Sequence, residues 1–182
     1  MSSAVLDQDI KEQLSQYLQM LEGDLLIKVS AGDDQASGDM MSFLKEIASL
    51  SPRITIEKTK LPRTPSFTIQ PAGAAGQDGR ITFAGIPLGH EFTSLVLALL
   101  QVSGRAPKAE PDILDQIKAI KGEYRFETYV SLSCHICPDI VQACPQSFGG
   151  RIKPLTIVLD VEGDQIGATH QLHIYSSCVG ML

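Results

Sequence analysis

The same order of helices and strands is predicted twice along this chain of 182 residues, and this internal repeat limits the folds that the chain can adopt. In each half an amphipathic helix precedes a short apolar strand, a loop and a second helix. Aligning Val29 with Val130 places the loop GDDQA opposite SCHIC, and Thr64 then lies opposite Thr169 after a similar separation. Two copies of one unit that contains a βαβ arrangement are therefore predicted, in the α/β class.

The boundary between the two copies is predicted near residue 104. Residues 103–111 (SGRAPKAEP) combine two prolines and a glycine with no apolar periodicity, as linkers do. A first half of residues 1–104 and a second half of residues 105–182 follow. The expected elements are helices 7–21, 40–50, 91–102, 112–120 and 138–143, and strands 25–31, 54–58, 67–69, 81–84 and 125–132.

The charge balance and the apolar pattern exclude some classes of function. The 15 Lys and Arg residues are scattered among 21 Asp and Glu, and the net charge of -6 argues against a nucleic-acid partner. The longest apolar stretch, Phe92–Val102, is shorter than the roughly 20 residues that span a bilayer, so no membrane segment is predicted. The N-terminus lacks the features of a signal peptide, and a cytoplasmic location is expected.

The motif with the clearest chemistry is Cys134-His135-Ile136-Cys137, at the end of a predicted strand and the start of a predicted helix. A thiolate at a helix N-terminus faces unpaired backbone N–H groups, which stabilise it and favour nucleophilic attack. That placement assigns the nucleophile to Cys134, with His135 as a further stabilising group. Cys137, one turn later, would resolve a mixed disulfide formed at Cys134.

A zinc site is the main alternative for these cysteines, and an inert pair is a third interpretation. Structural zinc sites usually show a second closely spaced pair of ligands, whereas Cys144 and Cys178 stand alone in the sequence. Both are interpreted as small buried apolar residues. The residues that could supply zinc ligands are Cys134, Cys137, Cys144, His170, His173 and Cys178.

Two longer segments make the sequence recognisable. Phe83–Leu100 (FAGIPLGHEFTSLVLALL) and Phe126–Ala143 (FETYVSLSCHICPDIVQA) resemble the N-terminal domain of the alkyl hydroperoxide reductase flavoprotein, the F subunit of that enzyme. The resemblance runs over residues 7–143. It implies two tandem thioredoxin-like folds, of which only the second carries the redox pair. Residues after Ala143 match poorly, so the C-terminal end of the second fold is expected to be truncated or divergent.

The resemblance also implies a function in peroxide detoxification. In that family the domain takes electrons from a thioredoxin-reductase-like flavoprotein module, which holds FAD and is fed by NADH. It passes them to the disulfide of a peroxiredoxin, the C subunit of alkyl hydroperoxide reductase. The chain has no G-x-G-x-x-G, so FAD and NADH are expected on a separate or missing module, and no cofactor or metal is assigned to this chain. A homodimer is an implication of the resemblance alone.

Three residues receive roles from the resemblance. Cys134 would be the nucleophile, Cys137 the resolving thiol, and Glu91, in the segment GHEF, a group that exchanges a proton with the thiols. For Glu91 the alternative is a carboxylate favoured at a helix N-terminus by the helix dipole. If the redox assignment is wrong, the chain is a partner-binding or zinc-stabilised thioredoxin-like scaffold without redox turnover.

One position departs from the thioredoxin-like pattern. Such folds place a cis-proline before the strand that faces the redox pair, and Pro65 fits this place in the first half, whereas His170 occupies it in the second. A cis bond before a residue other than proline costs about 2.5–4 kcal/mol, so the peptide before His170 is expected to be trans. Either the partner-docking surface differs, or His170 joins the cysteines at a metal.

Overall fold

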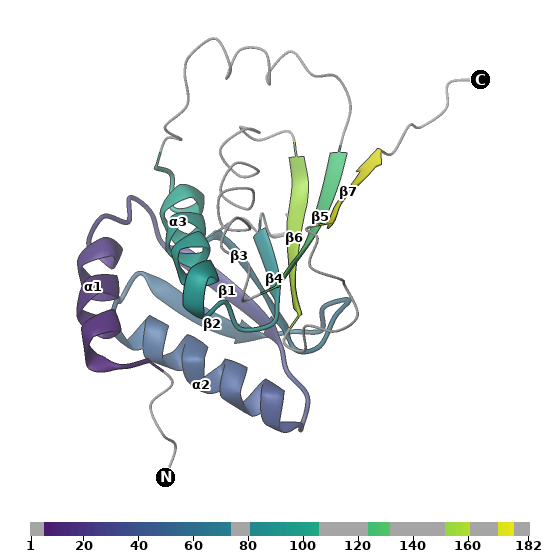
Figure 1. Ribbon diagram of the computed structural model, residues 1–182. Coiled ribbons are helices and arrows are strands. Elements are labelled where there is room, and N and C mark those ends of the chain that lie inside the picture. The colour runs from purple at the N-terminus through teal and green to yellow at the C-terminus, as the bar shows by residue number, and fades with distance from the viewer. Residues whose placement is uncertain (1–5, 74–80, 106–123, 132–151, 161–170, 177–182) are drawn as a thin grey trace.

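The computed structural model describes residues 6–73, 81–105, 124–131, 152–160 and 171–176 (Figure 1). Three α-helices and a one-turn 3-10 helix lie in this part of the chain, together with seven strands that form one mixed sheet. In chain order the elements are α1 (Gln8–Leu18), β1 (Leu25–Ser30), α2 (Gln35–Ser49), β2 (Ile54–Lys58), β3 (Ser66–Pro71), β4 (Ile81–Ala84), η1 (Gly89–Glu91), α3 (Phe92–Val102), β5 (Tyr124–Ser131), β6 (Ile152–Asp160) and β7 (Gln171–Ser176).

The elements predicted for the first half form, with one clear correction. Strands β2 and β4 have the bounds expected from the sequence. Helix α2, however, begins at Gln35 rather than at Met40, because the side chain of Asp34 accepts the backbone N–H of Ser37 and caps the helix. The predicted elements did not include β6 or β7. The helices expected at 112–120 and 138–143 lie outside the described residues.

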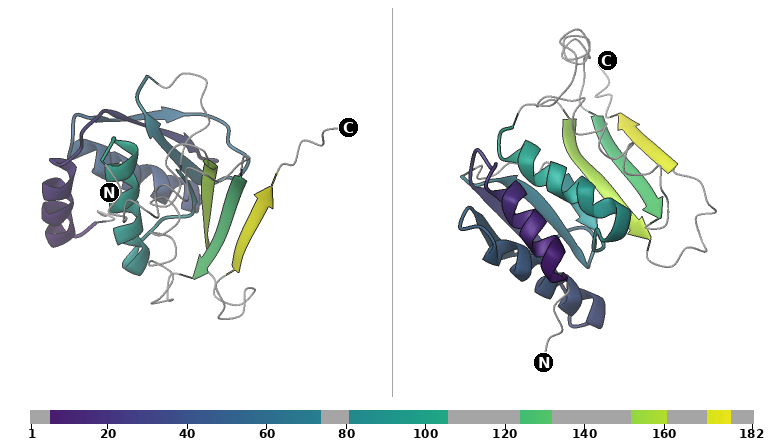
Figure 2. Two further views of the ribbon diagram at one scale, coloured as in Figure 1. Left: turned by 90° about the horizontal axis from the view of Figure 1, so that it is seen from above. Right: turned by 60° about the vertical axis from the view of Figure 1, so that its left-hand side comes forward.

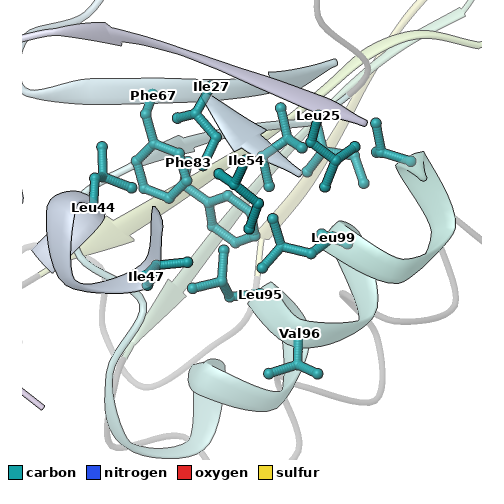
Figure 3. Close-up of a cluster of buried hydrophobic side chains, with 14 of the residues drawn as sticks. Leu25, Ile27, Leu44, Ile47, Ile54, Phe67, Phe83, Leu95, Val96 and Leu99 are labelled. Carbon is teal, nitrogen blue, oxygen red and sulfur yellow. The ribbon is translucent and has the colours of Figure 1, made fainter. Parts of the chain in front are cut away.

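The core lies between the first four strands and the helices that cover one of their faces. Phe67 of β3 and Phe83 of β4 are fully buried and stack with their ring centroids 5.3 Å apart. Leu44 and Ile47 from α2 and Leu95 and Leu99 from α3 converge on the two rings (Figure 3). This arrangement follows from the sequence, because apolar residues alternate along the strands and recur at helical spacing in α2 and α3.

Helix α1 completes this layer beside α3 (Figure 2). Asp7 caps α1, and Leu14 and Leu18 bury its inner face. Lys11 pairs with Glu46 of α2 across 3.3 Å. No helix in the described part of the chain combines the length and the apolar character that crossing a membrane would require.

The sheet continues from the first half directly into the second. Its strand order is β2-β1-β3-β4-β6-β5-β7, and β4 pairs in parallel with β6 from Ile81 opposite Leu155 to Ala84 opposite Val158. Strand β6 contains Pro154, and the register of β5 against β6 shifts between Arg125 and Glu127. A proline cannot donate to a sheet, so inside a sheet it occurs at such irregularities.

Gly85 lies close against β6 of the second half, and this approach gives a stability prediction. Its φ is +121°, and a Cβ at this position would lie 2.8 Å from Cβ of Leu159 in β6. Gly85→Ala is therefore expected to lower the free energy of unfolding by about 1–3 kcal/mol, measured by chemical denaturation. In contrast, Gly38→Ala in α2 meets no atom within 4 Å and is expected to raise stability by about 0.5–1 kcal/mol. Equal effects of the two substitutions would contradict this packing.

Candidate functional site

The first half shows how this fold arranges a strand end, a helix start and a cis-proline. The peptide bond between Thr64 and Pro65 is cis, as the sequence predicted. The hydroxyl oxygens of Thr64 and of Ser30, the last residue of β1, lie 2.6 Å apart and share a hydrogen bond. The segment that precedes β3 is thereby attached to the end of β1, where the loop to α2 begins.

Hydrogen bonds close the loop that occupies, in the first half, the place aligned with the cysteine pair. Asp34 accepts the backbone N–H of Ser37 at 2.9 Å and the Ser37 hydroxyl at 2.8 Å. These two hydrogen bonds, the backbone one first, hold the pKa of Asp34 below its ordinary value. The same Ser37 hydroxyl accepts the N–H of Gly32 at 2.8 Å. This loop carries no thiol, in agreement with a redox-silent first half.

The cysteines themselves lie outside the described residues. Strand β5 ends at Ser131, shortly before Cys134 in the sequence, and Cys137, Cys144, Cys178 and His170 are also outside the described ranges. His173 is in β7, where its register partner is Glu127 of β5. Within the described ranges no group of three or more His, Cys, Asp or Glu side chains is placed to hold a metal. The roles of the two redox cysteines and the zinc alternative stay predictions.

Glu91 is described, and its surroundings are unusual for a carboxylate. It lies at the junction of η1 and α3 and is completely buried, with 0% of its surface exposed. Its side chain does not cap α3, and neither carboxylate oxygen has a hydrogen-bond partner of good geometry among the described residues. Burial raises the pKa of Glu91 above its ordinary range, and the nearby Ser94 hydroxyl offsets only part of this effect.

Comparisons with known proteins place this arrangement in a family, although no protein-family model matches the chain. A protein from Ferdinandcohnia aciditolerans named NADH dehydrogenase is 66% identical over 139 residues, which are 76% of this chain and 26% of that protein. The F subunit of alkyl hydroperoxide reductase from Staphylococcus epidermidis is 53% identical over 139 residues, 76% of this chain and 27% of that protein. This chain therefore spans about a quarter of the length of these relatives.

Solved structures agree in fold and in name. The tandem N-terminal domain of AhpF, the F subunit of alkyl hydroperoxide reductase, from Enterococcus faecalis superposes with a TM-score of 0.77 and 27% identity, over 93% of this chain and 90% of that one. A mutant of the same AhpF has a TM-score of 0.72 and 30% identity, over 84% of this chain and 79% of that one. The chain belongs to the family of the AhpF N-terminal domain. The predicted resemblance and the α/β, thioredoxin-like fold class are confirmed.

In this AhpF-family domain, α3 carries buried polar atoms that the sequence analysis did not single out. Ser94 Oγ and Gln101 Oε1 are buried and lack hydrogen-bond partners of good geometry in the described part of the chain, as the Glu91 oxygens do. At about 100° per residue the three side chains fall on one side of the helix. The signal available in the sequence was the spacing of Ser94 and Gln101 after Glu91 in a segment that, apart from Thr93, is otherwise apolar.

The burial of Glu91 predicts how the stability of the AhpF-family domain depends on pH. In the unfolded chain a glutamate loses its proton near pH 4.3, whereas folded Glu91 keeps its proton to higher pH. The folded state then binds more protons, so this residue lowers wild-type stability as pH rises from about 4.3 toward the raised pKa. Glu91→Gln removes that dependence.

As pH rises through this window, the free energy of unfolding of Glu91→Gln is expected to increase relative to that of wild type by up to about 1.4 kcal/mol per pH unit. Chemical denaturation of both proteins at a series of pH values measures it. The exposed Glu57→Gln variant serves as the control for the substitution itself. A constant difference between Glu91→Gln and wild type from pH 4 to pH 8 would show that Glu91 ionises as an ordinary surface carboxyl.

Proposed function

We propose that this domain is a thiol-disulfide relay in peroxide detoxification, which transfers two electrons from the Cys134–Cys137 pair to the disulfide of a peroxiredoxin, the C subunit of alkyl hydroperoxide reductase. The observation that carries the proposal is the 53% identity to an alkyl hydroperoxide reductase F subunit over 76% of the chain. The Cys-x-x-Cys motif supplies the chemistry that such a relay needs. The first half supports its placement, because the aligned loop there joins a strand end to the start of α2.

The exchange proceeds in two balanced steps. The thiolate of Cys134 attacks one sulfur of the peroxiredoxin disulfide, a mixed disulfide forms, and the other peroxiredoxin sulfur leaves as a thiolate and takes up a proton. Cys137 then loses its proton and attacks the sulfur of Cys134. The second peroxiredoxin thiol is released, and Cys134 and Cys137 are left as a disulfide. Two electrons and two protons have passed to the peroxiredoxin.

Glu91 fits the proton transfers in this scheme. A carboxyl whose pKa is raised by burial keeps a proton closer to neutral pH than an exposed one does, and so can give it up to or take it from a thiol. Neither of its two oxygens has a hydrogen-bond partner of good geometry among the described residues. We therefore propose Glu91 as the group that exchanges protons with the pair, contributed by the redox-silent half.

The remaining assignments belong to the same proposal. The division into residues 1–104 and 105–182 separates the redox-silent copy from the copy with the cysteines. Electrons would reach Cys134–Cys137 from a flavoprotein module of the thioredoxin reductase type that holds FAD and accepts hydride from NADH. The proposed setting is the cytoplasm.

A redox titration of the full chain tests the function. The thiol accessibility of Cys134 and Cys137 is followed in dithiol–disulfide buffers, and the zinc content is measured on the same sample. A zinc-free protein that titrates as one two-electron couple and, once reduced, converts a peroxiredoxin disulfide to thiols is expected. One zinc per chain with inaccessible thiols would favour the zinc-stabilised scaffold instead. A pair that titrates reversibly without reducing a peroxiredoxin would overturn the partner assignment.

A further inference from the structure

A cluster of three side chains joins the two halves of the chain. Its members are Arg63, Glu127 and Tyr129. Arg63 lies in the loop between β2 and β3, and the other two residues lie in β5. Arg63 and Tyr129 are 66 positions apart in the sequence. Arg63 Nη2 donates to the Tyr129 hydroxyl at 3.1 Å and lies 3.7 Å from Glu127 Oε2. The Tyr129 hydroxyl in turn donates to Glu127 Oε2 at 3.3 Å. The guanidinium carbon is also 5.8 Å from the centre of the Tyr129 ring.

The backbone that carries Arg63 is held firmly in the first half. The Ser66 hydroxyl donates to the carbonyl of Arg63 at 2.6 Å. The next residue, Thr64, shares its 2.6 Å hydrogen bond with Ser30 at the end of β1. These hydrogen bonds fix the backbone of the segment from which Arg63 extends toward β5. The Arg63 side chain can therefore hold β5 in place relative to the first half.

Glu127 is the partner that makes this contact energetically significant. Its side chain is only 11% exposed, compared with 42% for Arg63. Removing a cation that contacts a largely buried carboxylate costs more than breaking an exposed ion pair, because less water screens the interaction. The pair of Arg53 with Asp24 has the same 3.7 Å separation, but both of its side chains are exposed and both belong to the first half. It is a matched control for Arg63.

Strand β5 is the element on which this contact acts. It lies between β6 and β7 in the sheet, and it ends at Ser131, directly before the segment that contains Cys134. Glu127 and Tyr129 are two residues apart on the strand and so face the same side of the sheet. A displacement of β5 along or away from Arg63 would also displace Ser131, from which the chain continues toward Cys134.

We propose that Arg63 is a positioning residue through which the redox-silent half holds β5 by its contacts with Glu127 and Tyr129, and that this contact affects the reactivity of Cys134, which follows β5 in the sequence. The assignment of Cys134 rests on the proposed function. The contact between Arg63 and β5 does not, and the experiment separates the two.

The test compares Arg63→Met, Arg63→Lys, Tyr129→Phe and the control Arg53→Met in the full chain. Hydrogen exchange of the β5 amides measures how firmly the strand is held, with β1 and β3 as internal references. The pH profile of Cys134 alkylation in the reduced protein measures the consequence at the thiol. Arg63→Met is expected to raise exchange in β5 by about tenfold, with less change in β1 and β3, and to slow alkylation near pH 7 several-fold. Arg63→Lys and Tyr129→Phe should give smaller changes in both, and Arg53→Met should match wild type.

Three results would overturn the proposal. The first is β5 exchange in Arg63→Met that equals that of Arg53→Met. The second is an equal rise of exchange in β1, β3 and β5, which would indicate general destabilisation. The third is faster exchange in β5 with an unchanged alkylation profile, because Arg63 would then support the strand without affecting the reactivity of Cys134. A wild-type pair that is alkylated normally but does not reduce a peroxiredoxin would instead remove the proposed function and leave the contact with β5 standing.

Discussion

Replacing Cys134 with serine is expected to lower the rate of disulfide exchange with a peroxiredoxin by about 10³-fold or more, because the thiolate that attacks the partner disulfide is lost. Cys137→Ser should differ in kind. Its Cys134 still attacks, but no thiol resolves the product, so a mixed disulfide between the two proteins should accumulate. Non-reducing electrophoresis and mass spectrometry of the quenched reaction detect that species.

Cys144→Ser provides the control for this pair of variants. It changes a cysteine that follows the motif in sequence but is interpreted as a buried apolar residue, so it should react at about the wild-type rate and trap nothing. A mixed disulfide that forms equally well in Cys134→Ser would assign the nucleophile to Cys137. If none of the variants slowed the reaction, dithiol exchange through this motif would have to be abandoned.

The second large effect is expected in the core. Phe67→Ala should lower the free energy of unfolding by about 3–5 kcal/mol, because it removes a fully buried ring and leaves a cavity beside Phe83. Phe67→Leu keeps most of the volume and should cost less. Denaturation in urea or guanidinium measures both values. Tyr17→Ala on the exposed side of α1, where 46% of the residue is accessible, should change stability by no more than about 0.5 kcal/mol.

Much of the first half could be predicted from its sequence because local and tertiary preferences agree there. Leu25, Ile27 and Val29 alternate with less buried residues in β1, and the structure buries all three. The predicted start of α2, at Met40, was wrong because the polar segment GDDQASGD resembles a loop in composition. Its first residues become helical only through the cap that Asp34 provides.

The second half was harder to predict for physical reasons that its residues make plain. Strand β6 contains Pro154, which weakens a strand pattern, and its pairing with β4 depends on contacts far apart in the sequence. The resemblance based on Phe83–Leu100 and Phe126–Ala143 was confirmed, since long similar segments do not depend on such local signals.

The candidate site, too, could be predicted from the sequence only in part. A Cys-x-x-Cys motif is visible in the sequence by itself, and it carried the hypothesis of redox chemistry. The complete burial of Glu91 is not visible there, because it depends on what packs over the start of α3. The partners of Arg63 could not be predicted either, since Glu127 and Tyr129 approach it only when β5 has joined the sheet.

The parallel pairing of β4 with β6 affects how this chain can be divided. If residues 1–104 were produced alone, the backbone N–H and C=O groups with which β4 pairs to β6 would face solvent along a new edge. An open strand edge of this kind recruits other strands, so the fragment is expected to associate with copies of itself. One copy of the sequence repeat alone therefore leaves the hydrogen bonds between β4 and β6 unmade, and the smallest unit that makes them contains both copies.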